Sequence, residues 1–167
     1  MNNNTTLGKM FLEELEAEAT ATRKCLERTP VNLFNWKPHQ KSMSMEYLSL
    51  IVAEIPKWIT YMVEKGDIDF ATFEHVKIKT TEELVKHFDH NMENVRKALQ
   101  NVSDEELSKP FSLKNKGQVL FTSPEKDNIG SSINHLVHHR GQLTVYLRLN
   151  DIAIPSIYGP SADERVF

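Results

Sequence analysis

Four segments of the sequence repeat apolar residues at intervals of three and four, and this repeat narrows the possible folds more than any other feature. The spacing places the apolar side chains on one face of a helix, and that face must be buried against another element. The segments run from Thr5 to about Arg28, from Ser44 to about Lys65, from Thr80 past Leu99, and from Ser123 to about Asn150. The sequence therefore predicts an all-α fold, a bundle of four helices.

Residues that commonly begin and end helices stand at the ends of these segments. Ser44 is a favoured N-cap, Gly66 is a favoured stop, and Thr80 opens a capping box with Glu83. Pro124 suits the first position of the last helix, where its missing N–H costs little. These signals fix the predicted boundaries more firmly than the apolar repeat does.

Two regions outside the four segments also have recognisable patterns. Before the last helix, two brief alternating runs flank Asn115-Lys116-Gly117 and are compatible with a small β-hairpin. After the last helix, the tail carries prolines but also several isoleucines. It is too apolar to extend freely into solvent, so we expect it to fold back over the bundle.

Length, composition and charge limit the classes of protein to which the chain can belong. Its 167 residues, 40% apolar and 26% charged, fit a single globular domain spanning residues 1–167. No run approaches the length of a membrane span, and the polar start lacks the pattern of a secretory signal, so we expect a cytoplasmic protein that binds no membrane. A formal net charge of −3 argues against nucleic acid as a partner. The lone Cys25 is expected to be an inert, packed thiol.

Two histidines in the last predicted helix are the main candidates for a functional site. His135 and His139 are four residues apart and lie on one helical face, where their rings can converge on one ion. Gln142 and Tyr146 share that face. Such a pair is also often a coincidence of the surface, because two ligands do not make a metal site. Leu136 stands where zinc proteases carry their glutamate, which excludes that chemistry.

Arg140 falls within the apolar stripe of the same helix. A guanidinium there needs a carboxylate partner or a place at a subunit interface. Glu54 and Glu14 are the first candidates for the partner. We therefore expect a structural ion pair rather than a role in binding substrate.

Three stretches of the sequence resemble a known family in their order and spacing. They are WKPHQKSMSMEYLSLIVAEIPKW, HLVHHRGQLTVYLR and IPSIYGPSADE, and they span most of the chain from Trp36 to Glu164. The chain resembles the DinB-like family, which includes the YfiT-type metal-dependent hydrolases and the bacillithiol and mycothiol S-transferases. The resemblance implies an up-down-down-up bundle with a long crossover between the second and third helices. It also implies a homodimer and one divalent ion, zinc or nickel, on three histidines.

The resemblance assigns two of the three metal ligands to His135 and His139, and the third position falls on Ile51. Isoleucine offers no lone pair, so the site is left with two protein ligands. Losing one of three ligands should cost several kcal/mol of metal affinity. Glu54, one turn further along, is a potential substitute ligand.

Two functions follow from the resemblance and from this departure. The first is a metal-dependent hydrolase or thiol S-transferase, in which the ion polarises a substrate or holds a thiol cosubstrate or water. The second is a non-catalytic module that has lost its metal and binds a small molecule or a second copy of itself. The sequence names no general base. In either case the expected pocket residues are Trp36, Ile51, Glu54, Gln142, Tyr146 and Tyr158.

Overall fold

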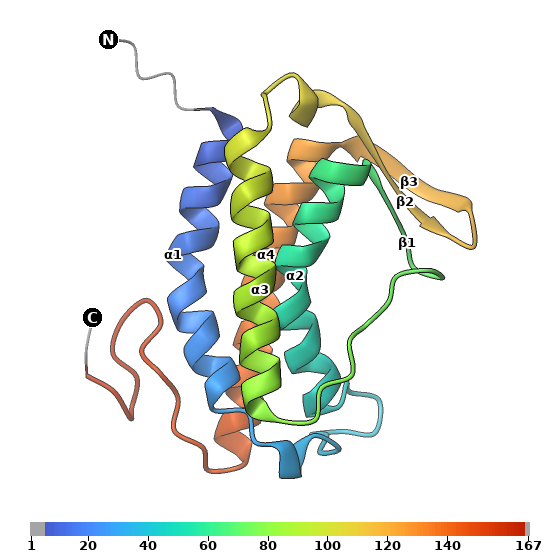
Figure 1. The fold of residues 1–167 in the computed structure, drawn as a ribbon. Helices are drawn as coiled ribbons and strands as arrows, with labels where there is room; N and C mark the ends of the chain where they lie inside the picture. The colour runs from blue at the N-terminus through green and yellow to red at the C-terminus, as the bar shows by residue number, and fades with distance from the viewer. Residues whose placement is uncertain (1–5, 166–167) are drawn as a thin grey trace.

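The computed structural model describes residues 6–165, which form a mostly helical fold (Figure 1). The helices are α1 (Leu7–Glu27), α2 (Met45–Lys65), α3 (Thr81–Asn101) and α4 (Glu125–Leu149), with short 3-10 helices η1 (Val31–Leu33) and η2 (Glu106–Ser108). The strands are β1 (Asp67–Asp69), β2 (Pro110–Asn115) and β3 (Gln118–Pro124). Helix α2 packs against α3 and α4, and α1 packs against the same two helices. None of the helices in this part of the chain is long and apolar enough to cross a bilayer.

The helix boundaries agree closely with those predicted from the caps. The hydroxyl of Ser44 accepts the N–H of Tyr47 at 3.2 Å, and Gly66 ends α2 in the left-handed region with φ of 67°. The hydroxyl of Thr80 likewise accepts the N–H of Glu83, as a capping box requires. The predicted start at Thr5 lies outside the described residues.

The last helix begins one residue later than predicted. Pro124 is the final residue of β3 and the N-cap of α4, so the first helical residue is Glu125. Proline suits this position as well, because the N-cap residue does not donate its N–H to a hydrogen bond of the helix.

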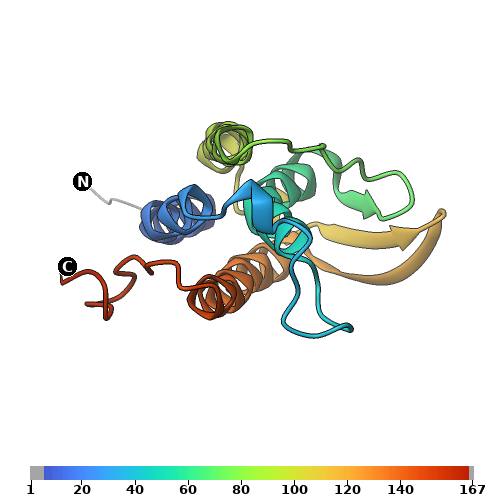
Figure 2. The same cartoon turned by 90° about the horizontal axis from the view of Figure 1, so that it is seen from below.

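A small sheet of three strands accompanies the helices, so the all-α prediction, which allowed for a hairpin, is confirmed only as a mostly helical fold. The hairpin compatible with the sequence is present as antiparallel β2 and β3, and β1 adds a third strand parallel to β2. The carboxylate of Asp69 accepts the N–H groups of Lys116 and Gly117 at 2.9 and 2.7 Å, which ties the end of β1 to the hairpin turn. Figure 2 shows the sheet extending to one side of the bundle, beside α2 and α4.

The segment from Phe70 to Thr80, here called the crossover, joins β1 to the start of α3. It has no regular secondary structure and runs along the bundle in Figure 1. The ammonium group of Lys57 donates to the carbonyl of Glu74 at 2.8 Å, and the ring of Phe73 packs edge-on against Trp58 with centroids 6.2 Å apart. Side chains of α2 therefore hold the crossover against the helices.

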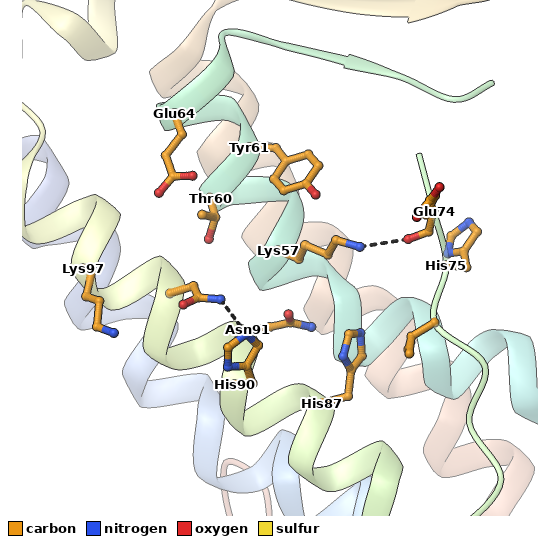
Figure 3. A pocket seen from close by; sticks show the side chains of 12 residues that line it. Lys57, Thr60, Tyr61, Glu64, Glu74, His75, His87, His90, Asn91 and Lys97 are labelled. Atoms are coloured by element: carbon orange, nitrogen blue, oxygen red, sulfur yellow. Dashed lines mark hydrogen bonds between the residues drawn. The ribbon is translucent and has the colours of Figure 1, made fainter. Parts of the chain in front are cut away.

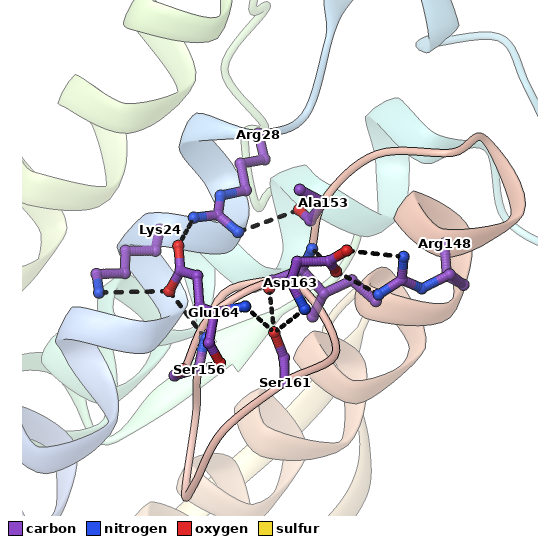
Figure 4. A network of polar contacts seen from close by, with 9 residues as sticks. Lys24, Arg28, Arg148, Ala153, Ser156, Ser161, Asp163 and Glu164 are labelled. Carbon is purple, nitrogen blue, oxygen red and sulfur yellow. Dashed lines mark hydrogen bonds and ion pairs between the residues drawn. The ribbon is translucent and has the colours of Figure 1, made fainter. Parts of the chain in front are cut away.

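The tail folds back along α1 and α4, as predicted. Figure 4 shows Glu164 bound to Arg28, the C-cap of α1, and Asp163 bound to Arg148 of α4. The hydroxyl of Ser161 donates to the carbonyl of Ile154 at 2.7 Å and closes a loop within the tail. The tail thus connects the C-terminal end of α1 with α4.

Candidate ligand-binding site

The structure brings His135 and His139 together, as their spacing predicts. Their ring centroids lie 4.4 Å apart, and His139 is only 8% exposed whereas His135 is exposed. Nδ1 of His139 is 2.7 Å from the carbonyl oxygen of the Gln142 side chain. Burial lowers the pKa of both imidazoles, and for His135 the neighbouring His139 lowers it further. Both rings therefore favour the neutral form.

The remaining positions around this pair do not supply a metal site. Ile51 is buried and has no donor atom. Glu54 is fully buried, and its carboxylate is held by Nδ1 of His75 at 2.5 Å and Nε2 of His87 at 3.3 Å. Across residues 6–165, no three histidine, cysteine, aspartate or glutamate side chains gather in a way that would hold an ion. Two neighbouring imidazoles do not fit the coordination that a tightly bound divalent ion needs.

The other expected pocket residues are divided between two regions. Trp36 and Tyr146 meet edge-on with centroids 5.3 Å apart, and the hydroxyl of Tyr146 donates to the carbonyl of Met43. Tyr158, expected as a second wall, lies instead in the tail and lines a separate groove against α1. It therefore does not accompany the histidine pair.

A cavity of about 250 Å³ opens beside His135. Six aromatic side chains line it: Tyr47, Trp58, Phe70, Phe73, Phe111 and Phe121. Polar groups come from His75, Asn128, Ser131, Ser132 and His135. The ring of Trp58 is 5.6 Å from that of His135. Five parts of the chain, namely α2, β1, the crossover, the hairpin and α4, contribute to this aromatic pocket.

Sequence reasoning missed most of the aromatic pocket. Trp58 follows Ile51 by seven residues, which is two helical turns, so the helical spacing could have placed it on the same face. Phe73 lies in the crossover, where no periodicity indicates which way a side chain points, and the alternation around Phe121 does not indicate which element its strand will face.

A larger groove of about 630 Å³ lies between α2, α3 and the crossover (Figure 3). Its lining mixes the cations of Lys57 and Lys97 with the carboxylates of Glu64 and Glu74. This groove is more open than the aromatic pocket and does not include the histidines of α4. Mostly apolar walls with a few polar groups are typical of small-molecule sites, so the aromatic pocket is the stronger candidate.

Arg140 is buried as predicted, but its partner is neither Glu54 nor Glu14. Its Nη1 lies 2.6 Å from Oε2 of Glu18 on α1, and its Nη2 donates to the hydroxyl of Tyr158 at 2.8 Å. The Tyr158 hydroxyl in turn donates to the carboxylate of Glu18 at 3.0 Å. The guanidinium thus joins α4, α1 and the tail, which is a structural role.

Cys25 is fully buried, and burial raises the pKa of its thiol to about 11. The thiolate is the reactive form, so we expect no reaction with Ellman's reagent in the native protein at pH 8. One equivalent should react after denaturation in guanidinium chloride. Rapid reaction of the native protein would show that α1 opens readily at this position.

A family model described as the DinB family matches residues 1–165. The uncharacterized protein YrdA of Bacillus subtilis (strain 168) is 28% identical over 158 residues, covering 92% of this chain and 89% of that protein. Among solved structures, a DinB-like protein (YjoA) from Bacillus subtilis has a TM-score of 0.68 at 17% identity, covering 93% of this chain and 99% of that one. A DinB-like protein from Bacillus cereus ATCC 10987 also has a TM-score of 0.68, at 20% identity, covering 89% and 95%.

Proposed function

Because the chain belongs to the DinB family, we propose that it is a member that binds a small, mostly apolar molecule in the aromatic pocket and holds no resident divalent ion. The observation that carries this proposal is the partly open pocket of about 250 Å³, lined mainly by aromatic and aliphatic side chains, beside His135. This volume lies just below the range of about 300–1,000 Å³ that suits drug-sized ligands, so the expected ligand is smaller.

The distribution of polar groups in the aromatic pocket supports this choice. Asn128, Ser132 and His135 place hydrogen-bonding groups along the α4 wall, while most of the other walls are aromatic. Among the described lining residues there is no aspartate, glutamate, lysine or arginine. A charged ligand would lose its hydration there without gaining an oppositely charged side chain, so the lining favours a neutral ligand.

The proposal is tested by measuring ligand binding before and after a large side chain is introduced into the aromatic pocket. The probe is 4-ethylanisole, a neutral aromatic ether, titrated into the protein and followed by two-dimensional NMR. Saturable shifts are expected at residues that line the aromatic pocket. Ser131→Phe should fill the space and weaken binding at least about tenfold, corresponding to about 1.4 kcal/mol.

The matched control is Asn134→Phe, an exposed position three residues further along α4. It adds the same ring outside the aromatic pocket and should change the affinity less than twofold. Shifts that do not saturate, or equal binding by Ser131→Phe and the native protein, would contradict the proposal.

The metal-dependent hydrolase or thiol S-transferase remains the alternative, and the close approach of His135 and His139 is the observation that favours it. Elemental analysis of protein purified without a histidine tag separates the two functions. One divalent ion per chain, lost on replacing both histidines by alanine, would support the enzyme and overturn the metal-free proposal.

We also infer that the helices follow the up-down-down-up order of the family. Support comes from the crossover, which is long enough to return the chain from the end of α2 to the beginning of α3. The homodimer implied by the resemblance stays a prediction, which light scattering on the purified protein tests.

A further inference from the structure

Glu54 is a fully buried carboxylate whose described partners include no lysine or arginine. It accepts from the backbone N–H of Val76 at 3.3 Å and contacts the rings of His75 and His87. These partners come from the crossover and from α3, and Figure 3 shows His75 and His87 on these two segments at the groove. A buried carboxylate is costly unless it is hydrogen-bonded, so the two imidazoles are required to satisfy it.

The arrangement fixes which nitrogen of His75 carries hydrogen. Burial alone would raise the pKa of Glu54, but hydrogen bonds from His87 and His75, and the amide of Val76, outweigh burial and lower it. The carboxylate is therefore ionised, and its oxygens can only accept. Nδ1 of His75, 2.5 Å from Oε2, must be the donor. In the neutral form of the ring, which carries one N–H, this leaves Nε2 of His75 with a free lone pair.

The ring of His75 also belongs to the aromatic pocket. Its centroid lies 5.2 Å from that of Phe73 and 6.0 Å from that of Tyr47, and all three residues line the pocket. Nδ1 faces the buried carboxylate, so Nε2 is on the side of the ring directed away from it. The His75 side chain is 39% exposed, so part of the ring is open to solvent.

We propose that the aromatic pocket selects a small phenol or alcohol, whose hydroxyl donates a hydrogen bond to Nε2 of His75 while its apolar body lies among the aromatic rings. This inference rests on the proposed function and names its ligand class. Glu54 acts as a positioning residue, because it sets the tautomer of His75 without touching the ligand. A neutral hydroxyl fits better than an ammonium or a carboxylate, since the described lining residues include no acid or strong base.

The test compares 4-ethylphenol with 4-ethylanisole, which lacks the hydroxyl hydrogen, in native protein and in His75→Phe. NMR titrations give both affinities and show that the variant is folded. In native protein the phenol should bind about fivefold more tightly than the ether, as expected for one net hydrogen bond. In His75→Phe, which keeps a ring between Tyr47 and Phe73, this preference should disappear. His90→Phe, in the neighbouring groove, is the matched control and should keep the preference.

A second measurement reads the tautomer directly. Imidazole nitrogen chemical shifts of native protein should show His75 protonated at Nδ1. In Glu54→Gln, the amide NH₂ can donate to that nitrogen, so the population should move towards the Nε2–H form and the preference for the phenol should weaken.

The outcomes separate the two proposals. Equal affinity for phenol and ether in native protein, or a preference that survives in His75→Phe, overturns the proposed role of His75. Neither result contradicts the proposed binding of small molecules in the aromatic pocket. An Nε2–H tautomer in native protein also overturns it. Failure of both probes to bind overturns the proposed function as well.

Discussion

Replacing Glu18 by alanine is expected to lower the free energy of unfolding by about 3–5 kcal/mol, because it leaves a buried guanidinium without its counter-charge. The side chains of Arg140 and Glu18 are 1% and 15% exposed, so water can replace the lost partner only poorly. The Tyr158 hydroxyl, which donates to Glu18, loses its acceptor too. Urea denaturation followed by circular dichroism measures the change.

The matched control for this ion pair lies on the same helix. Glu16 pairs with Arg96 of α3, but these side chains are 37% and 40% exposed. Glu16→Ala should therefore cost no more than about 1 kcal/mol. The double replacement Glu18→Leu with Arg140→Leu should recover most of the stability lost in Glu18→Ala, since it removes both charges. Equal costs for Glu18→Ala and Glu16→Ala would show that Arg140 finds another partner or water.

Replacing Ile51 by histidine is expected to increase the affinity for Zn²⁺ or Ni²⁺ at least about hundredfold, because it restores a third imidazole to the family pattern. Ile51 lies on α2, which packs against the helix that carries His135 and His139. The variant should also be less stable without metal, since a polar ring replaces a buried isoleucine. Competition titration with a chromogenic chelator measures the affinity.

Ile59→His provides the comparison for that substitution. Ile59 is also buried in α2, but it lies eight residues from Ile51. The substitution introduces the same ring about two turns further along α2, and the metal affinity should stay close to that of native protein. No gain in Ile51→His relative to Ile59→His would mean that the third family position does not face the pair on α4.

The sequence predicted the parts of the molecule that depend on local rules. Caps at Ser44 and Thr80 place helix starts because a side chain satisfies backbone groups only three residues away. His135 and His139 meet because they are four residues apart, which is about one turn of α4. Strand β1 was missed because its three residues carry too little pattern, and its pairing with β2 depends on a segment more than forty residues away.

The contacts that sequence reasoning missed all join distant segments. Helical periodicity predicts the face of α4 on which Arg140 lies, but not which turn of α1 packs beside it. It therefore cannot distinguish Glu18 from Glu14, one turn earlier, as the partner. His75 lies in the crossover, where no repeat indicates its direction, and its bond to Glu54 spans 21 residues. The position of Tyr158 depends likewise on how the tail folds.

The aromatic pocket is assembled from α2, β1, the crossover, the hairpin and α4, so a compound bound in it stabilises the whole domain. The unfolded chain has no such pocket, so any compound that occupies it must shift the folding equilibrium, by about 2.7 kcal/mol at a hundred times its dissociation constant. Melting temperature therefore reports binding whatever the chemical class of the compound. A thermal-shift screen of hydroxylated and methylated aromatic pairs would search for the natural ligand on this basis.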